Sequence, residues 1–167
     1  MKKPELTQET LKEILRYDPD TGMFRWRVRK RTSLRAGQIA GCRAHSAHWC
    51  IGIDGRTYRA HQLAWLYMTG QWGRPLVDHR DGNPLNNRWR NLRLSSYSNS
   101  VANQARTQSN TSGFKGVTLD RRRGKWMAQI KKDGRRYWLG RFATAEAAHE
   151  AYVTAARLLF GEFARTE

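Results

Sequence analysis

The spacing of apolar positions near the start of the chain predicts a short helix followed by a strand. Residues 5–16, ELTQETLKEILR, repeat leucine and isoleucine at helical spacing, which puts the apolar side chains on one face. The sequence DPDTG at 18–22 is rich in turn-forming residues. MFRWRV at 23–28 then alternates apolar with basic residues, as a half-buried strand does.

Two further alternating runs predict a β-hairpin with a helix behind it. HWCIGI at 48–53 and RTYRA at 56–60 flank Asp-Gly, the pair that favours a two-residue hairpin turn. The next run, HQLAWLYMTG at 61–70, is typical of a helix that ends at its glycine. Beyond it we expect little regular structure until LRLS at 92–95, after which Ser96 caps a helix to about residue 106.

The last third of the chain has a different pattern, which predicts a small sheet packed on one helix. The strand candidates FKGVTLD, GKWMAQIKKDG and RRYWLGRF follow one another between residues 114 and 142, and Asp133-Gly134 joins the last two as a tight hairpin. Thr144 then caps a helix that Gly161 stops. The apolar face of this helix is rich in alanine, which lets a helix approach a sheet closely.

These patterns predict an α+β chain made of two modules. The first module covers residues 1–106, and residues 107–113, TQSNTSG, form a small polar linker. Residues 114–167 form the second module, a three-stranded antiparallel sheet packed on one helix.

The charge balance indicates what kind of partner the protein has. The chain holds 31 Lys and Arg against 14 Asp and Glu, a net charge of +17 that is spread along both halves. Such an excess predicts a polyanionic partner, with nucleic acid as the first candidate. A membrane is excluded as the partner because no long apolar run or basic amphipathic helix is present. No signal-peptide pattern opens the sequence, so we expect a cytoplasmic location.

Two cysteines and two histidines lie close together in CRAHSAHWC. Cys42, His45, His48 and Cys50 are all potential zinc ligands. Their spacing lacks the paired Cys-x2–4-Cys knuckles that arrange ligands around a tetrahedron. We therefore expect reduced thiols and a polar loop that enters a strand.

The stretch VDHRDGNPLNNRWRNLRLSSYSNS at 77–100 carries candidate chemistry. Hydrolysis of a phosphodiester needs a group that takes a proton from water and positive charge that stabilises the departing 3′ oxygen. A histidine with a near-neutral pKa can do the first, and a divalent metal held by a carboxylate can do the second. Asp78 and His79 are adjacent, so in an extended segment their side chains point to opposite sides. From the residues alone, an ordinary polar loop stays as the alternative.

The series YRAHQLAW, VDHRDGNPLNNRWRNLRLSS and NSVAN resembles the HNH endonucleases of phages and mobile introns, which belong to the ββα-metal (His-Me finger) class. The resemblance covers about residues 10 to 105. It implies that His79 is the general base, that Asp78 is a metal ligand and that Asn91 orients the histidine. It also implies one divalent metal ion, Mg²⁺ or Mn²⁺, because hard oxygen ligands favour these ions over zinc, and no other small-molecule cofactor.

One position departs from the family pattern. The family usually places its last metal ligand, an asparagine or histidine, about nine residues after the middle asparagine, and Ser100 stands there in this chain. Asn99 comes just before it, and a shift of one residue rotates a helical side chain by about 100°. We favour Asn99 as the ligand and keep Ser100 as the alternative. The same departure keeps open a DNA-binding protein without catalysis, either a regulator or a decayed nuclease.

SGFKGV, GKWMAQI, YWLGRF and TAEAAHEAY resemble the DNA-binding domain of plant ethylene-response factors, over about residues 110 to 165. This domain is also found fused to phage HNH nucleases. One face of such a sheet packs on the helix, and the other can enter the major groove. The alternation of the strands, with the basic turn before them, gives the candidate DNA contacts: Arg121, Arg122, Arg123, Lys125, Gln129, Lys131, Arg136 and Trp138. Arg123 and Gln129 replace a tryptophan and a glutamate of the plant pattern, so the plant site preference does not transfer.

The two resemblances together predict a DNA endonuclease that binds duplex DNA through both modules. Because one HNH site cuts one strand, we expect a site-preferring nickase or a homing-type endonuclease that acts as a monomer or weak dimer. RNA is the weaker alternative as a partner, because the second module resembles a reader of duplex DNA. If the chain is phage-encoded, the expected location is the cytoplasm of the host cell.

Overall fold

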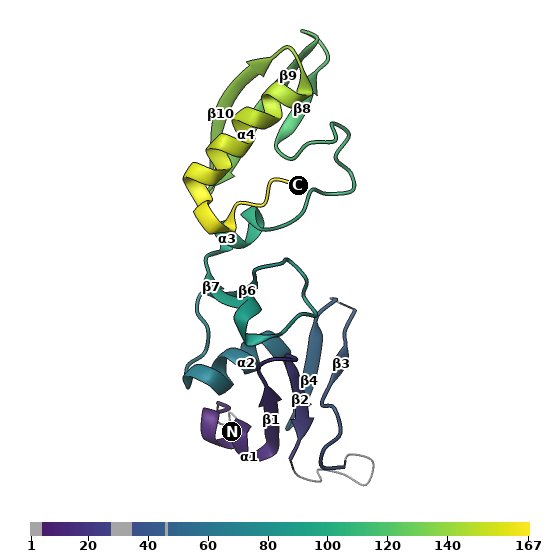
Figure 1. Ribbon diagram of the computed structural model, residues 1–167, viewed down its shortest axis with the longest axis vertical. Helices are drawn as coiled ribbons and strands as arrows, with labels where there is room; N and C mark the ends of the chain where they lie inside the picture. Colours follow the sequence, from purple (N-terminus) through teal and green to yellow (C-terminus); the bar gives the residue numbers. More distant parts are fainter. Residues whose placement is uncertain (1–4, 28–34, 46) are drawn as a thin grey trace. The chain divides into compact units, whose positions relative to one another are not determined.

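The computed structural model describes residues 5–27, 35–45 and 47–167 and divides into two compact units, Met1–Ser95 and Ser96–Glu167 (Figure 1). Each unit contains helices and short antiparallel sheets that pack around its own core, which confirms the predicted α+β class. The predicted strand end at Val28 lies outside the described residues. In the described part of the chain, no helix has the length and apolar character needed to cross a membrane.

The first unit opens with a helix and a hairpin. Helix α1 (Gln8–Ile14) is capped by Thr7, and strand β1 (Leu15–Asp18) pairs antiparallel with strand β2 (Met23–Trp26). The helix predicted to residue 16 is therefore too long. Pairing with β2 makes residues 15–18 a strand, in which buried and exposed positions alternate with a period of two.

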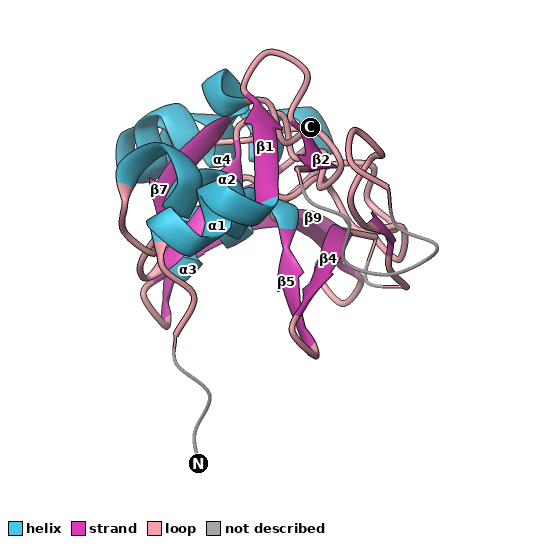
Figure 2. Ribbon diagram, turned by 90° about the horizontal axis from the view of Figure 1, so that it is seen from below, coloured by secondary structure: helices cyan, strands magenta, loops and turns pink. Residues whose placement is uncertain are grey.

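The predicted second hairpin and its helix are present. Strands β3 (Cys42–Arg43), β4 (Trp49–Ile53) and β5 (Arg56–Arg59) form a sheet in that order, and Figure 2 shows β4 and β5 side by side. Helix α2 (Ala60–Thr69) follows β5 directly and ends at Gly70, whose φ of 76° is left-handed.

A third strand pair carries the stretch of chemical interest. Strand β6 (Leu76–His79) pairs antiparallel with β7 (Leu92–Ser95), and a single turn of 3₁₀ helix, η1 (Trp89–Asn91), precedes β7. We expected little regular structure between Gly70 and LRLS at 92–95, and strand β6 shows that this expectation was wrong. The run is only four residues long and ends in two polar residues, so its pairing with β7 leaves no clear apolar alternation to detect.

The core of the first unit supports this strand pair. The largest fully buried side chains are Leu11, Leu15, Phe24, Ile51, Leu63 and Leu66. Val77 of β6 and Leu92 of β7 belong to the same cluster. The residues next to them, Asp78 and His79, are therefore anchored by burial of their neighbours.

The second unit is a sheet covered by one helix. It contains helix α3 (Tyr97–Ala102), strands β8 (Val117–Asp120), β9 (Lys125–Lys132) and β10 (Arg135–Phe142), helix α4 (Ala145–Phe160) and the turn η2 (Gly161–Phe163). The strand order is β10-β9-β8, and Figure 1 shows α4 running along one face of the sheet.

Small side chains allow the close packing of α4 on the sheet. Ala128 of β9 and Ala148 of α4 are both completely buried in one cluster, and Ala156 is 1% exposed in another. Thr144 caps α4, because its hydroxyl accepts the Ala147 N–H, and Gly161 follows the last helical residue. These features match the predicted helix.

Candidate nuclease site and DNA-binding face

Strand β6 places Asp78 and His79 next to each other on an extended backbone. The two residues are 9% and 6% exposed. Adjacent residues of a strand point to opposite faces, so the two side chains have separate partners, as described below.

The His79 ring is fixed by an amide of the following loop. His79 Nε2 lies 3.1 Å from Asn87 Oδ1. An amide oxygen only accepts hydrogen bonds, so Nε2 carries the proton and donates it. In a neutral imidazole the other nitrogen, Nδ1, is then the one with a basic lone pair.

The turn between β1 and β2 holds the loop that presents Asn87. The Tyr17 hydroxyl donates to the Asn87 carbonyl at 2.6 Å, and the Trp89 N–H donates to the Pro19 carbonyl at 2.9 Å. Gly22 has a φ of 75°, and a Cβ there would lie 2.5 Å from Arg88 N and 2.8 Å from Asn87 O. The turn can approach the loop only because residue 22 is a glycine.

Asn91 makes different contacts from those implied by the sequence. Its side chain donates to Asp81 Oδ1 at 2.9 Å and to the Asn86 carbonyl at 2.8 Å, and its Oδ1 accepts the Asp81 N–H at 3.2 Å. The contact with the His79 ring that was assigned to Asn91 is made by Asn87. Asn91 instead closes the loop between β6 and β7. The residue types give no signal that separates the two roles, because five asparagines lie between residues 77 and 100.

Asp81 is the second support of this loop. Asn86 Nδ2 donates to Asp81 Oδ2 at 2.6 Å, and the Asn83 N–H donates to Oδ1 at 2.9 Å. Partial burial works against the charged carboxylate, but the hydrogen bonds from Asn86, Asn83 and Asn91 outweigh it and hold the pKa of Asp81 below its ordinary value.

Two more histidines surround His79. The ring centroid of His61, on α2, lies 4.8 Å from that of His79, and the His48 ring lies 5.4 Å from His61 and 6.4 Å from His79. The sequence did not indicate this cluster, because its three residues come from segments that are separated in sequence.

Burial in this cluster favours the neutral form of His61 and His79. Burial, with smaller contributions from His79, His48 and Arg59, lowers the pKa of His61 to about 3. Burial is also the largest influence on His79 and lowers its pKa, although the hydrogen bond to Asn87 and the nearby Asp81 oppose the shift. His79 is therefore neutral near pH 7, the form that can accept a proton.

Asp78 is paired with an arginine across the strand ladder. Asp78 and Arg93 are Cα partners of β6 and β7, and Arg93 Nε and Nη2 both lie 3.3 Å from Asp78 Oδ2. The arginine compensates the charge of a buried carboxylate, which would otherwise be costly to desolvate. Sequence reasoning singled out Asp78 and gave Arg93 no role.

The donor set suits a hard divalent metal. Within the described ranges, no three His, Cys, Asp or Glu side chains come together as a metal cage, and the Cys42–Cys50 loop provides none either. Mg²⁺ does not need such a cage, because it keeps several waters and takes one or two carboxylates with substrate phosphate. The buried carboxylate of Asp78 fits this pattern.

The other predicted ligands lie on α3 in the second unit. Asn99 and Ser100 are both half-buried, and Ser96 caps the helix by accepting the Asn99 N–H at 3.1 Å. The helix begins at Tyr97, so the two side chains leave it about 100° apart. Only one of them can face a given point.

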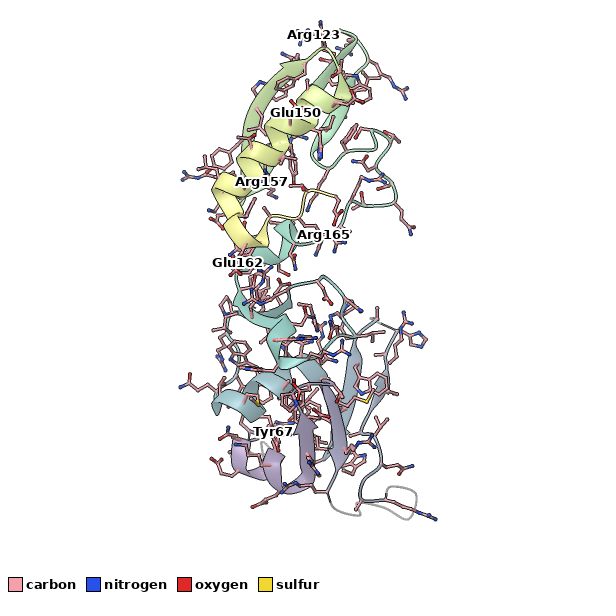
Figure 3. The ribbon with its side chains drawn as sticks, in the orientation of Figure 1. Tyr67, Arg123, Glu150, Arg157, Glu162 and Arg165 are labelled. Carbon is pink, nitrogen blue, oxygen red and sulfur yellow. The ribbon has the colours of Figure 1, made fainter. Side chains whose placement is uncertain are left out.

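The predicted DNA contacts gather on one face of the β8–β10 sheet. Lys131 pairs with Arg136 and Gln129 pairs with Trp138 across β9 and β10, so these four side chains share a face. Ala128 and Ile130 point the other way into the core. Lys125 lies on the same face as Gln129 by alternation along β9. The remaining residues, Arg121, Arg122 and Arg123, occupy the exposed turn between β8 and β9, where Figure 3 labels Arg123.

A β-bulge adds Arg141 to this face. The register of β10 shifts between Trp138 and Gly140, so Arg141 pairs with Met127 on the Trp138 side. Its guanidinium lies 4.9 Å from the Trp138 ring centroid, and its Nε lies 3.4 Å from Asp120 Oδ2. Strict alternation would have put Arg141 on the opposite face, and only the glycine at 140, with φ of 131°, signals the bulge.

Two family profiles match different parts of the chain. A family profile described as HNH endonuclease matches residues 58–101, and one described as AP2 domain matches residues 112–162. "Protein 3.8" of Escherichia phage T7 is 36% identical over 89 residues, which are 53% of this chain and 73% of that protein.

Plant transcription factors are also similar to part of the chain. "Ethylene-responsive transcription factor ERN1" of Medicago truncatula is 48% identical over 63 residues, 36% of this chain and 23% of that protein. "Dehydration-responsive element-binding protein 2A" of Oryza sativa is 40% identical over 67 residues, 39% of this chain and 24% of that protein. The chain thus spans about a quarter of these plant relatives, whereas it spans nearly three quarters of the phage relative. The chain belongs to the phage HNH endonuclease family, here with a C-terminal DNA-binding domain of the AP2 type.

Proposed function

We propose that this protein is a metal-dependent endonuclease that hydrolyses phosphodiester bonds of duplex DNA and nicks one strand at preferred sites, in the manner of a homing-type enzyme. The observation that carries the proposal is the state of His79. It is a buried, neutral imidazole whose Nε2 is fixed by Asn87, which leaves Nδ1 as the basic nitrogen.

His79 would act as the general base. Its Nδ1 takes a proton from the attacking water, and the Asn87 amide keeps the ring and its tautomer in place as the imidazolium forms. Asp81 and Asn91 hold the loop that carries this amide. A divalent ion, Mg²⁺ or Mn²⁺, held by Asp78 and by Asn99 or Ser100, would supply positive charge for the departing 3′ oxygen.

The second unit would supply most of the affinity and the site preference. Its basic face carries Lys125, Lys131 and Arg136 for phosphate or guanine, and Gln129 suits an adenine edge. Trp138 is 52% exposed among these charges, which a solvated face does not require. Two modest sites on one chain gain through effective concentration.

A DNA-binding protein without catalysis is the second candidate. Two observations favour it: Ser100 stands where the family usually has an asparagine or histidine, and Asp78 is paired with Arg93. A regulator or decayed nuclease would keep the DNA-binding face and the loop while losing the metal.

A supercoiled-plasmid nicking assay separates the two candidates. The wild type is compared with His79→Ala in the presence of Mg²⁺, Mn²⁺ or EDTA, and the affinity of both proteins for duplex DNA is measured in EDTA. We expect metal-dependent relaxed circles from the wild type, a loss of about 100-fold or more in the variant, and nearly equal affinities. Tight binding with no cleavage by the wild type would favour the non-catalytic candidate, and a fully active variant would exclude His79 as the base.

A further inference from the structure

Helix α3 belongs to the nuclease by sequence and to the DNA-binding unit by packing. The HNH endonuclease match ends at residue 101, within α3, and the AP2 match begins only at residue 112. The compact units nevertheless divide between Ser95 and Ser96, so α3 lies wholly in the unit that contains the β8–β10 sheet. The helix is therefore held there by contacts with residues of the second unit.

The side chain of Lys115 supplies the central contact. Its Nζ donates to the carbonyls of Ala102 at 2.7 Å, Gln104 at 2.6 Å and Arg165 at 2.9 Å. An ammonium group has three donors, so all three are used. Ala102 is the last residue of α3, and helix ends leave carbonyls without partners that a lysine can satisfy.

These three hydrogen bonds of Lys115, called the clamp below, account for an α3 that is shorter than the sequence predicts. The helix was expected to run to about residue 106 but ends at Ala102. Gln104 N bonds back to the Val101 carbonyl at 3.2 Å, which tightens the last turn, and Lys115 then takes the carbonyls of Ala102 and Gln104. A lysine eleven residues beyond the turn ends the helix, which no local pattern would indicate.

Three further contacts fix α3 to the same unit. The Arg165 N–H donates to the Ala102 carbonyl at 3.3 Å, from the C-terminal segment labelled at Arg165 in Figure 3. Ser98 Oγ accepts the Asp133 N–H at 2.9 Å from the β9–β10 turn. The Ala102 side chain is buried in a cluster with Tyr152 and Phe160 of α4.

These contacts define which side of α3 is attached. Ser98 and Ala102 are four residues apart and lie on one face of the helix. Asn99 and Ser100 follow Ser98 by about 100° and 200° around the helix axis. The predicted metal ligands therefore lie away from the attached face.

We propose that Lys115 is a positioning residue that makes α3 a rigid part of the DNA-binding unit, so that the side chains of Asn99 and Ser100 move with the sheet that binds DNA. The inference rests on the proposed function for its effect on cleavage, but the clamp itself does not depend on cleavage. It also implies that residues 107–113, predicted as the linker, form a loop within the second unit. DNA bound on the sheet would then determine where the ligand of α3 is presented.

Hydrogen–deuterium exchange of the full chain in EDTA tests the clamp without any metal or cleavage. The readout is the exchange rate of the peptide that covers residues 97–103, with and without duplex DNA. In the wild type we expect added DNA to slow this exchange. In Lys115→Met, which removes all three donors, we expect exchange about 10-fold faster and no slowing by DNA.

Lys132→Met is the matched control. Lys132 Nζ also donates to a carbonyl of the same unit, that of Leu159 at 2.6 Å, but it makes no hydrogen bond to α3 among the described residues. Exchange of α3 should be unchanged in this variant, and β9 should stay protected in both. Unchanged α3 exchange in Lys115→Met, or equal acceleration in Lys132→Met, would overturn the proposal. If Lys115→Met fails to fold, Ser98→Ala takes its place, because it removes one contact of α3 and should accelerate exchange by a smaller factor.

The Mn²⁺ dependence of plasmid nicking then tests the effect on the site. We expect Lys115→Met to raise the half-maximal Mn²⁺ concentration several-fold, with the affinity for duplex DNA within about two-fold of the wild type. If α3 exchanges faster in Lys115→Met but the half-maximal Mn²⁺ concentration is unchanged, Lys115 does not position the metal site. The proposed nuclease function would not be affected by that result. A wild type that never nicks would refute the nuclease, and the exchange experiment would still decide the clamp.

Discussion

A single amide determines which nitrogen of His79 can act as a base. Asn87 Oδ1 accepts the Nε2 proton, and the Tyr17 hydroxyl holds the backbone of the same residue. This is a sharper assignment than the residue types allow, because several asparagines lie within reach of the histidine in sequence. Burial, and to a smaller extent the nearby His48, lowers the pKa of His79 and so favours the neutral imidazole.

Removal of the Asn87 amide should therefore impair cleavage more than removal of a nearby amide. A hydrogen bond lost at a buried donor costs about 1–3 kcal/mol, which corresponds to roughly 5- to 150-fold in the nicking rate. We expect that loss for Asn87→Ala. Asn83→Ala is the control, because Asn83 bonds Asp81 and Leu85 in the same loop and has no bond to the ring among those described. Equal losses in the two variants would contradict the orienting role.

The depressed pKa of His61 predicts acid sensitivity of the first unit. The unfolded chain binds a proton at His61 near pH 6.5, whereas the folded chain does so only near pH 3. The unfolded state therefore holds more protons in this window, and the free energy of unfolding falls as the pH drops. From pH 7 to pH 5 the decrease should be about 2 kcal/mol.

Urea unfolding at each pH, monitored by hydrogen–deuterium exchange of peptides from α2 and β4, measures this decrease in the free energy of unfolding. Carboxylates titrate mostly below this window, so histidines dominate it. His61→Gln should flatten the pH dependence by most of the expected amount and leave only the smaller share of His79. A slope that His61→Gln leaves unchanged would show that burial of this histidine is not its source.

At the scale of elements, the turn between β1 and β2 is a part of the candidate site. It contacts the loop from Asn87 to Trp89 through backbone groups, and Gly22 leaves no room for a side chain between them. Residues 17–22 thus support the candidate site, although Tyr17 and Asn87 are 70 positions apart in sequence. A truncation or insertion in this turn would displace Asn87 and thereby change the orientation of the His79 ring.

Gly22→Ala tests this support against a glycine of similar conformation. Gly22 and Gly37 have φ of 75° and 83°, but a Cβ on Gly37 would meet nothing within 4 Å. Both changes should cost about 1 kcal/mol or more from left-handed strain. Only Gly22→Ala should also slow nicking at a temperature where both variants are folded. Equal nicking rates in the two variants would mean that the turn does not position the loop.

Elements with a local periodic or turn pattern could be predicted from the sequence, whereas elements that depend on a distant partner could not. The Asp54-Gly55 hairpin, α2, the three C-terminal strands and α4 follow from turn chemistry, periodicity and caps. Strand β6 exists because β7 pairs with it, and α3 ends where Lys115 reaches it. The roles of Asn87 and Arg141 likewise depend on a loop closure and on a β-bulge. Each of these depends on a partner that is distant or irregular in sequence.

On the scale of the whole molecule, the positive charge serves two separable functions in DNA binding. A net charge of +17 supplies salt-sensitive attraction to any nucleic acid. The β8–β10 face adds side chains that can meet base edges, and Arg141 pairs there with Asp120 and stacks on Trp138. An arginine tied in this way is less available for non-specific phosphate contacts than the exposed Arg121 and Arg122 of the turn.

The salt dependence of DNA binding should distinguish non-specific phosphate contacts from contacts to base edges. Each phosphate contact contributes about 0.9 to the slope of log K against log salt concentration. Arg121→Ala with Arg122→Ala should therefore weaken binding about equally on all duplexes and reduce the slope by about 2. Gln129→Ala should leave the slope unchanged and alter only the ratio of affinities between preferred and unrelated duplexes, because a neutral amide releases no counterions. Fluorescence anisotropy between 50 and 200 mM salt measures both quantities, and a slope that the double variant does not change would mean that the exposed turn lies away from the phosphates.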